Sequence, residues 1–234
     1  MSEPIWDWTS AGEAAGPILD AASLTLLAGL LSFGLALVLG LIWAVGKRAR
    51  FGIVRVVTTS VTEFIRRTPP LIQLYVAFFL LPEVGVVLAP LATGVLTLGL
   101  HFSTYIAEVY RGGIESVGRG QWDAGASLGL TRTRTLFSVI LPQALPPIVP
   151  ALGNYLIIMF KETPLLSAIA VLEMLERAKI IGSYSFRYTE PITEVGLIFL
   201  ALSLVSAAGI RYLEHRLWRG RRTAPSGKRI SSGE

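Results

Sequence analysis

Residues 120–142 read GQWDAGASLGLTRTRTLFSVILP, a short polar stretch that lies between long apolar segments. The stretch is too polar to cross a bilayer, and its residue order predicts a helix, a tight turn and a second helix. We expect the first helix over residues 121–128. Gly129 then supplies the left-handed residue that stops a helix, and Leu130 supplies the apolar contact that accompanies such a stop.

The second helix of this stretch begins near Thr131 or Thr133, either of which can cap it, and Pro142 ends or kinks it. Two short helices joined by a tight turn make a stiff element on which another protein can dock. Ala124 leaves the surface of the first helix shallow, and Asp123 offers a carboxylate to a basic partner. An ordinary helix at the membrane interface would show the same pattern, so both interpretations stay open at this point.

The composition is typical of a helical protein that crosses the membrane several times. Hydrophobic residues make up 52% of the chain and charged residues 16%, a balance that does not fit a soluble domain. The chain has no cysteine, which excludes disulfides and thiolate metal sites, and its two histidines, His101 and His215, are isolated. The net charge of +5 does not indicate nucleic-acid binding, because the basic residues flank apolar segments.

Five apolar segments are each long enough to cross the hydrocarbon, which takes roughly 20 helical residues at about 1.5 Å per residue. We expect these spans over residues 24–46, 53–81, 86–109, 145–172 and 192–213. The predicted fold class is therefore all-α, a polytopic membrane protein with about five transmembrane helices.

The basic residues also set the expected orientation. They cluster after the first, third and fifth spans, and positive residues favour the cytoplasmic side, so we expect the N-terminus outside and the C-terminus in the cytoplasm. Residues 111–142 then form a cytoplasmic loop, residues 1–19 an extracytoplasmic segment and residues 218–234 a basic cytoplasmic tail. The first sixteen residues hold no Lys or Arg, so we do not expect a signal peptide there.

The polar stretch resembles the "EAA" loop of ABC importer permeases, whose pattern is Glu-Ala-Ala, then a glycine, then Ile-x-Leu-Pro. The matching positions are Asp123, Ala124, Gly125 and Gly129, followed by residues 140–142. Aspartate in place of glutamate keeps the charge but shortens its reach. Glycine in place of the second alanine loosens the helix by about 1 kcal/mol.

Three further runs, over residues 63–74, 105–114 and 160–166, are similar to the polar amino-acid (histidine/glutamine) branch of these permeases. With the loop, the resemblance covers residues 20–217, which it identifies as the permease domain. The Lys-Glu-Thr-Pro-Leu-Leu run at residues 161–166 is reminiscent of permeases for ectoine and hydroxyectoine.

The resemblance implies a type I ABC importer transmembrane domain, multi-pass in a bacterial inner membrane. Its loop helix would be the coupling helix, which sits in a groove of a separate ATPase subunit; the residues are Gln121, Asp123, Ala124, Gly125 and Gly129. The chain holds no Gly-x4-Gly-Lys-Ser/Thr phosphate loop, so we expect a non-enzymatic permease with no cofactor of its own, and ATP and magnesium on the partner. The other implied partners are a second permease chain, identical or paralogous, a dimer of ATP-binding subunits, a periplasmic or surface solute-binding protein, and membrane lipid.

Charged residues inside the expected spans are candidates for the substrate path, because an unpaired charge there costs about 2.5–3.5 kcal/mol. Lys161 and Glu162 lie near mid-depth of the fourth span, and Asn154 shares a helix face with Lys161. Glu63 and Arg66 are three residues apart and also share one face. A cationic and an anionic group along a water-filled path suit a zwitterionic solute.

Two alternatives remain open from the sequence. The pairs Glu63–Arg66 and Glu108–Arg111 could instead be ion pairs that only hold helices together, and Lys161 and Glu162 could likewise only pack against opposite charges. The chain could also be an ion-coupled secondary transporter or channel. We further expect Pro69 and Pro70 to kink or break the second span and free backbone carbonyls, which membrane proteins tolerate beside a cavity.

Overall fold

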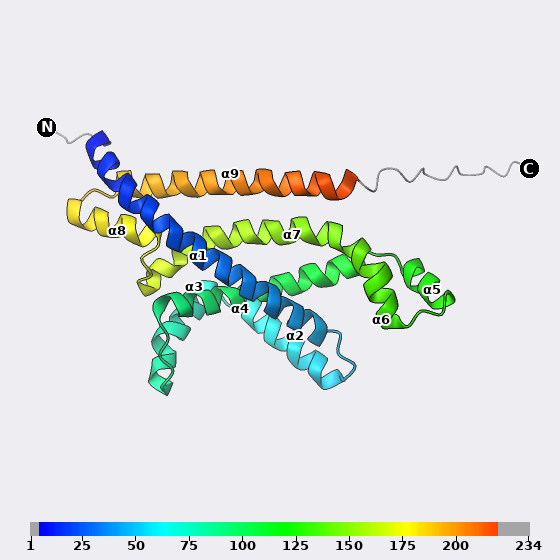
Figure 1. Cartoon of the computed structure of the whole chain (residues 1–234). Helices are drawn as coiled ribbons and strands as arrows, with labels where there is room; N and C mark the ends of the chain where they lie inside the picture. Colours follow the sequence, from blue (N-terminus) through cyan, green and yellow to red (C-terminus); the bar gives the residue numbers. More distant parts are fainter. Residues whose placement is uncertain (1–4, 220–234) are drawn as a thin grey trace, which may run out of the picture.

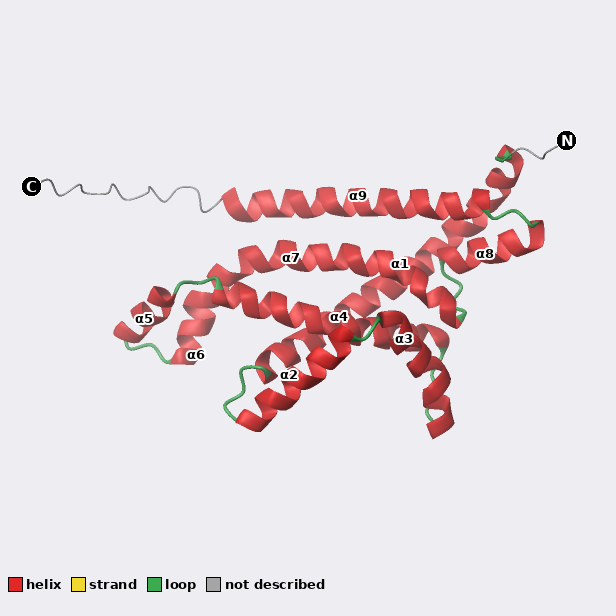
Figure 2. Ribbon diagram, turned by 180° about the vertical axis from the view of Figure 1, so that it is seen from behind, coloured by secondary structure: helices red, strands yellow, loops and turns green. Residues whose placement is uncertain are grey.

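The computed structural model describes residues 5–219, and all regular elements among them are helices (Figures 1 and 2). In chain order the elements are α1 (Trp8–Gly46), α2 (Gly52–Arg67), α3 (Pro70–Tyr75), the π-helical turn η1 (Val76–Leu80), the 3-10 turn η2 (Leu81–Val84), α4 (Pro90–Glu115), α5 (Arg119–Ser127), α6 (Arg132–Thr135), the π-helical turn η3 (Leu136–Ile140), α7 (Leu141–Glu162), the 3-10 helix η4 (Thr163–Ile169), α8 (Met174–Ser185) and α9 (Thr189–Arg219). The predicted all-α fold class is confirmed. The predicted tail over residues 218–234 lies almost wholly outside the described residues.

Three helical stretches of the described chain are long and apolar enough to cross a membrane: Trp8–Gly46, Arg132–Ile169 and Thr189–Arg216. They contain the first and fifth expected spans and residues 145–169 of the fourth. The second expected span coincides with the broken helix from α2 to η2, and the third with α4, which is helical but less apolar than these three stretches.

Helix α1 begins earlier than its apolar core suggests. The Asp7 carboxylate accepts a hydrogen bond from the Thr9 amide at 2.9 Å and caps the helix. With 39 residues, α1 is about 58 Å long, well beyond the roughly 30 Å of hydrocarbon. The boundary expected at residue 19 therefore falls inside this helix.

The first turns of α1 pack against α8 and α9. The buried residues of this small core are Ala14, Ile18, Met174, Ala178 and Val195. The main core lies between α1, α4 and the end of α7, where a Cβ on Gly29 would come within 2.6 Å of the Phe160 ring. This close approach brings α7 against α1.

An ion-pair network closes the other end of α1. Lys47 lies 2.6 Å from Glu108 of α4, and Arg111 lies 2.7 Å from the second oxygen of the same carboxylate. The expected Glu108–Arg111 pair is therefore present, and Lys47 extends it to a second helix. The Lys47–Glu108 pair joins the end of α1 to α4, so this network holds the two helices together.

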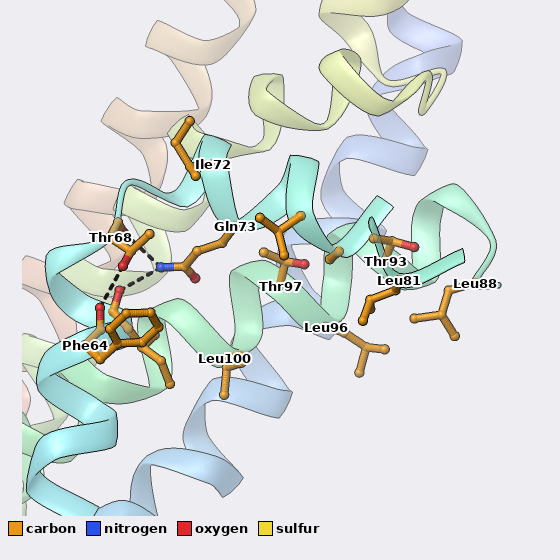
Figure 3. Close-up of a pocket in the computed structure, with 13 residues that line it drawn as sticks. Phe64, Thr68, Ile72, Gln73, Leu81, Leu88, Thr93, Leu96, Thr97 and Leu100 are labelled. Carbon is orange, nitrogen blue, oxygen red and sulfur yellow. Dashed lines mark hydrogen bonds between the residues drawn. The ribbon is translucent and has the colours of Figure 1, made fainter. Parts of the chain in front are cut away.

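The second span is broken at the expected place. Helix α2 ends at Arg67, and α3 begins at Pro70. The proline pair leaves backbone carbonyls without helical donors, and the side-chain amide of Gln73 donates to the carbonyls of Ile65 and Thr68 at 2.7 and 2.9 Å (Figure 3). The break is therefore satisfied from within the chain.

The helix that follows the loop is bent by Pro142, not ended by it. The π-helical turn η3 lies directly before this proline, and such turns take up an interrupted backbone ladder. Helices α6 and α7 consequently point in different directions (Figure 1). α7 then runs to Glu162 and tightens into η4 at Thr163, which divides the fourth expected span.

Candidate coupling surface and translocation site

The polar stretch forms the predicted helix, turn and helix. Gly129 has a left-handed backbone (φ 72°), and the amides of Gly129 and Leu130 donate to the carbonyls of Ala126 and Gly125 at 2.9 and 3.0 Å. These two bonds satisfy carbonyls at the end of α5 in the glycine-capped arrangement expected from the sequence. Thr131 caps α6 by accepting from the Arg134 amide at 3.3 Å.

The glycine at position 125 has a packing role that the sequence did not show. A Cβ on Gly125 would lie 2.5 Å from Cγ2 and 2.7 Å from Oγ1 of Thr135, which is itself buried. Helix α5 therefore crosses α6 at a distance that alanine does not permit. The expectation that glycine only loosens the helix is incomplete, because Thr135 occupies the space of the missing methyl group.

Helix α5, the turn at Gly129 and helix α6 form a corner, which we call the α5–α6 corner. Its outer face is exposed. Gln121, Asp123 and Ala124 are all exposed, whereas Gly125 faces α6. The apolar side chain of Leu128 is 78% exposed at the tip of the corner. An exposed leucine on a short, capped helix provides a firm apolar contact for a partner.

Behind α5 lies an open cavity of about 620 Å³ between this helix, the end of α4 and the start of α7. Its lining residues are Ser116, Val117, Gly118, Gly120, Gln121, Gln143 and Pro147. The Gln143 side chain donates to that of Gln121 at 3.2 Å and bridges α7 to α5. Helix α5 is therefore tied to α7 across this cavity.

The polar residues of α2 form a strip along one side of the helix. The strip consists of Arg55, Thr59, Glu63 and Arg66, spaced three or four residues apart and therefore on one face. The residues of α2 that are buried within the chain are Thr58 and Thr62, at the edge of this strip. Arg55 and Thr59 are exposed, whereas Glu63 and Arg66 are half-buried. The exposed part of the strip needs water or a partner chain beside it.

Arg66 lies at the end of this strip beside two aromatic rings. It is ion-paired with Glu63, as expected from their spacing. Its guanidinium also lies 5.8 Å from the Tyr105 ring centroid, and the Tyr105 hydroxyl donates to the Arg66 carbonyl at 3.4 Å. Tyr105 stands 5.9 Å from the ring of Tyr155 on α7, so α2, α4 and α7 meet at this point.

The cluster of His101, Tyr105 and Tyr155 was not predicted from the sequence, because only charged residues in the spans were taken as site candidates. His101 was treated as an isolated histidine, yet the ring lies 5.5 Å from Tyr105 and its Nδ1 lies 3.0 Å from the Gln73 amide nitrogen. Tyr105 and Gln73 both fall within the runs that carry the family resemblance, which is the signal that was available. Tyr155 directly follows the predicted Asn154.

The other predicted path residues stand apart from Glu63 and Arg66. Asn154 and Lys161 are exposed on α7, and Glu162 is half-buried where α7 passes into η4. Within residues 5–219, no hydrogen bond or ion pair joins these three side chains to Glu63 or Arg66. Their membership of one path therefore stays a prediction.

An apolar groove of about 390 Å³ lies between α2, α3 and α4 (Figure 3). Its lining includes Phe64, Ile72, Val76, Leu96 and Leu100, and none of the charged path candidates takes part. The groove therefore does not suit a charged solute.

A family described as "Binding-protein-dependent transport system inner membrane component" matches residues 36–219. The chain belongs to this family. The family description makes the chain an inner-membrane component of a transport system. This agrees with the permease class that we predicted from residues 120–142. The resemblance to ABC importer permeases is thereby confirmed.

Two curated relatives of this inner-membrane component align along almost their whole length. "Probable amino-acid ABC transporter permease protein y4tG" of Sinorhizobium fredii is 44% identical and covers 91% of this chain and 94% of its own. "Glutamine transport system permease protein GlnP" of Escherichia coli is 33% identical, with 91% and 98% covered.

The solved structure titled "Crystal structure of an amino acid ABC transporter with histidines" superposes on the inner-membrane component with a TM-score of 0.87. The two are 32% identical, and the match covers 92% of this chain and 100% of the other. A structure of the MetNI methionine ABC transporter matches at 19% identity with a TM-score of 0.66, which concerns the fold alone. The type I importer fold predicted from the sequence is confirmed.

Proposed function

We propose that this chain is the permease subunit of an ATP-driven importer for polar amino acids or related zwitterionic solutes. The relatives are named for amino acids in general and for glutamine, and a solved neighbour is titled with histidines. An osmolyte such as ectoine or hydroxyectoine is a second candidate, supported only by the run over residues 161–166.

The observation that carries the proposal is the placement of Arg66 between Glu63 and the Tyr105 ring, at the half-buried end of the polar strip of α2. A solute carboxylate can exchange with Glu63 for the guanidinium, and a solute ammonium can lie on an aromatic face. Because Glu63 already neutralises Arg66, the solute carboxylate only replaces one anionic partner of the guanidinium by another. This favours weak binding and quick release of the solute.

Lys161 and Glu162 provide a second pair of opposite charges farther along the proposed path. Asn154 lies on the same face of α7 as Lys161, seven residues earlier. We place Lys161 and Glu162 on the path because charged side chains without partners need water inside a membrane, and Asn154 because it shares the face of Lys161.

The energy is supplied by other chains in this proposal. Two permease chains, identical or paralogous, enclose the path, and a dimer of ATP-binding subunits holds the α5–α6 corners. ATP binding drives the pair outward only if ATP binds the two orientations with different affinity. A solute-binding protein delivers the solute at the outer face, and α1 begins on that side.

A solute panel tests the proposal. The transporter is reconstituted with its ATP-binding subunits and solute-binding protein, and uptake of labelled glutamine, histidine, cystine and ectoine is compared. We expect an amino acid to be concentrated and Arg66→Ala to raise the KM for it. Uptake of ectoine alone would replace the amino-acid assignment with the osmolyte, and a wild-type KM in Arg66→Ala would remove Arg66 from the path.

A further inference from the structure

The turn between α8 and α9 holds a bulky residue in a backbone conformation that favours glycine. Phe186 has φ 55° and ψ 20°, in the left-handed region. Side chains with a Cβ clash with the backbone there, so an aromatic residue in this region is an outlier. Such outliers persist where the surroundings fix them, and they gather at functional sites.

Neighbouring residues fix this turn from two sides. The Tyr188 ring packs on Gly182 so closely that a Cβ there would overlap with it. The Arg187 guanidinium donates to the buried carboxylate of Glu190 at 2.6 Å. The same carboxylate accepts from the Asp7 amide at 2.9 Å, which ties the turn to the start of α1. The backbone of the turn is therefore held in place.

This fixed backbone presents uncovered aromatic surface. Phe186 is 90% exposed and Tyr184 is 84% exposed. Arg177 lies seven residues before Tyr184, hence on the same face of α8, and is exposed without an ion pair to any residue in the range 5–219. We call Arg177, Tyr184 and Phe186 the outer corner.

The outer corner lies far from the coupling surface. Helix α8 stands at the end of α7 opposite to α5 and α6, between the spanning stretches Arg132–Ile169 and Thr189–Arg216 (Figures 1 and 2). If α5 and α6 dock on the ATP-binding subunits, as the proposed function holds, the outer corner faces the compartment from which solute is delivered.

We propose that the outer corner docks the solute-binding protein, with Phe186 in an apolar pocket of that protein and Arg177 against an acidic rim. A ring on a preorganised turn loses little freedom on binding, which is the property of an interface anchor. A lipid occupant fits less well, because ring insertion among headgroups needs no fixed backbone. In addition, the anionic lipids that attract arginine side chains lie in the cytoplasmic leaflet, on the opposite side of the membrane from the outer corner.

ATPase stimulation in nanodiscs tests this surface, with the assembled transporter and increasing concentrations of its solute-binding protein. Phe186→Ala removes the ring and keeps the strained backbone, whereas Phe186→Gly removes the ring and relieves the strain. We expect both to raise the half-stimulating concentration by about tenfold or more, as for an interface hot spot. Ala170→Gly is the matched control, because Ala170 is also left-handed (φ 59°) but presents no ring, and its curve should match the wild type.

Three results would overturn the proposal. One is an unchanged half-stimulating concentration in both Phe186 variants. Another is a Phe186→Trp variant whose fluorescence is quenched by brominated lipid with or without the binding protein, which would place the ring in the bilayer. The third is loss of the permease pair in both Phe186 variants, which would make the corner a contact between copies. A wild-type transporter that does not respond to the binding protein would instead refute the proposed function itself.

Discussion

Gly125 and Thr135 share one small space where α5 crosses α6. The Thr135 side chain is buried, and its Cγ2 stands 2.5 Å from the point where a Cβ on Gly125 would lie. ABC importer permeases resemble this chain in the loop but have alanine in the position of Gly125. In this chain, the missing methyl group of Gly125 leaves the space that the Thr135 side chain occupies.

Gly125→Ala should therefore damage the corner despite the better helix propensity of alanine. Overpacking of this kind costs about 1–3 kcal/mol, more than the roughly 1 kcal/mol that alanine returns. We expect weaker co-purification of the ATP-binding subunits and slower ATP-dependent uptake. Adding Thr135→Ala should restore both, since only a Cβ contact of 3.2 Å remains. A Gly125→Ala single variant with wild-type uptake would show that the two helices separate freely.

The left-handed cap makes a second test of the coupling surface. Gly129→Arg forces a bulky charged residue into φ 72° at the tip of the corner, at a backbone cost of about 1–2 kcal/mol. We expect assembled complexes that hydrolyse ATP without solute uptake. Gly129→Asn is the control, because asparagine tolerates this conformation, and it should keep most of the coupling. Normal uptake by an assembled Gly129→Arg variant would contradict the role of the corner.

Lys161 and Glu162 should affect transport and leave assembly intact. Both lack ion-pair and hydrogen-bond partners within the described chain, so Lys161→Met and Glu162→Gln break no polar contact there. We expect each to raise the KM for solute by about tenfold, the worth of one charge-assisted hydrogen bond of about 1.4 kcal/mol or more. Uptake kinetics with ATPase activity as the reference measure this. Wild-type affinity and rate in both variants would remove the two residues from the path.

Stability should depend on pH through the buried cap of α8. Burial raises the pKa of the Glu173 carboxyl to about 7, although the amides of Leu175 and Glu176 donate to it. The folded state thus holds a proton that the unfolded state, with a pKa of 4.5, releases. The stabilisation from this group is complete below pH 4.5 and is lost as the pH rises to about 7, by at most about 1.4 kcal/mol per pH unit.

Thermal unfolding of the purified protein between pH 5 and pH 8 measures this dependence. The Tm of the wild type should fall more steeply with pH than that of Glu173→Gln, which keeps an oxygen to accept from the helix amides. Parallel curves for the two proteins would show that Glu173 does not carry the effect.

The sequence predicted local features well where one residue type determines them. Gly129 stops α5, Thr131 caps α6 and Pro69 breaks the second span, as expected. Each of these follows from a property of the residue itself: the left-handed freedom of glycine, the side-chain hydroxyl of threonine or the missing amide hydrogen of proline. The Glu63–Arg66 pair followed in the same way from its helical spacing.

Side-chain contacts between separate helices were not predictable from the pattern. Gln73 completes the broken helix, Tyr105 and Tyr155 face each other across two helices, and Thr135 fills the space beside Gly125. These relations depend on how helices cross, and neither hydropathy nor helical period contains that information. The length of α1 was underestimated for a related reason, because its first turns pack on α8 and α9.

Energy coupling is the most direct test of the account. Proteoliposomes containing this chain, its partner permease chain and the ATP-binding subunits are given the solute-binding protein and labelled solute, with ATP inside or with an ion gradient alone. We predict accumulation that requires ATP and persists without any ion gradient. The account would be contradicted if vesicles that contain this chain alone, without nucleotide, accumulated the solute when only an ion gradient was applied.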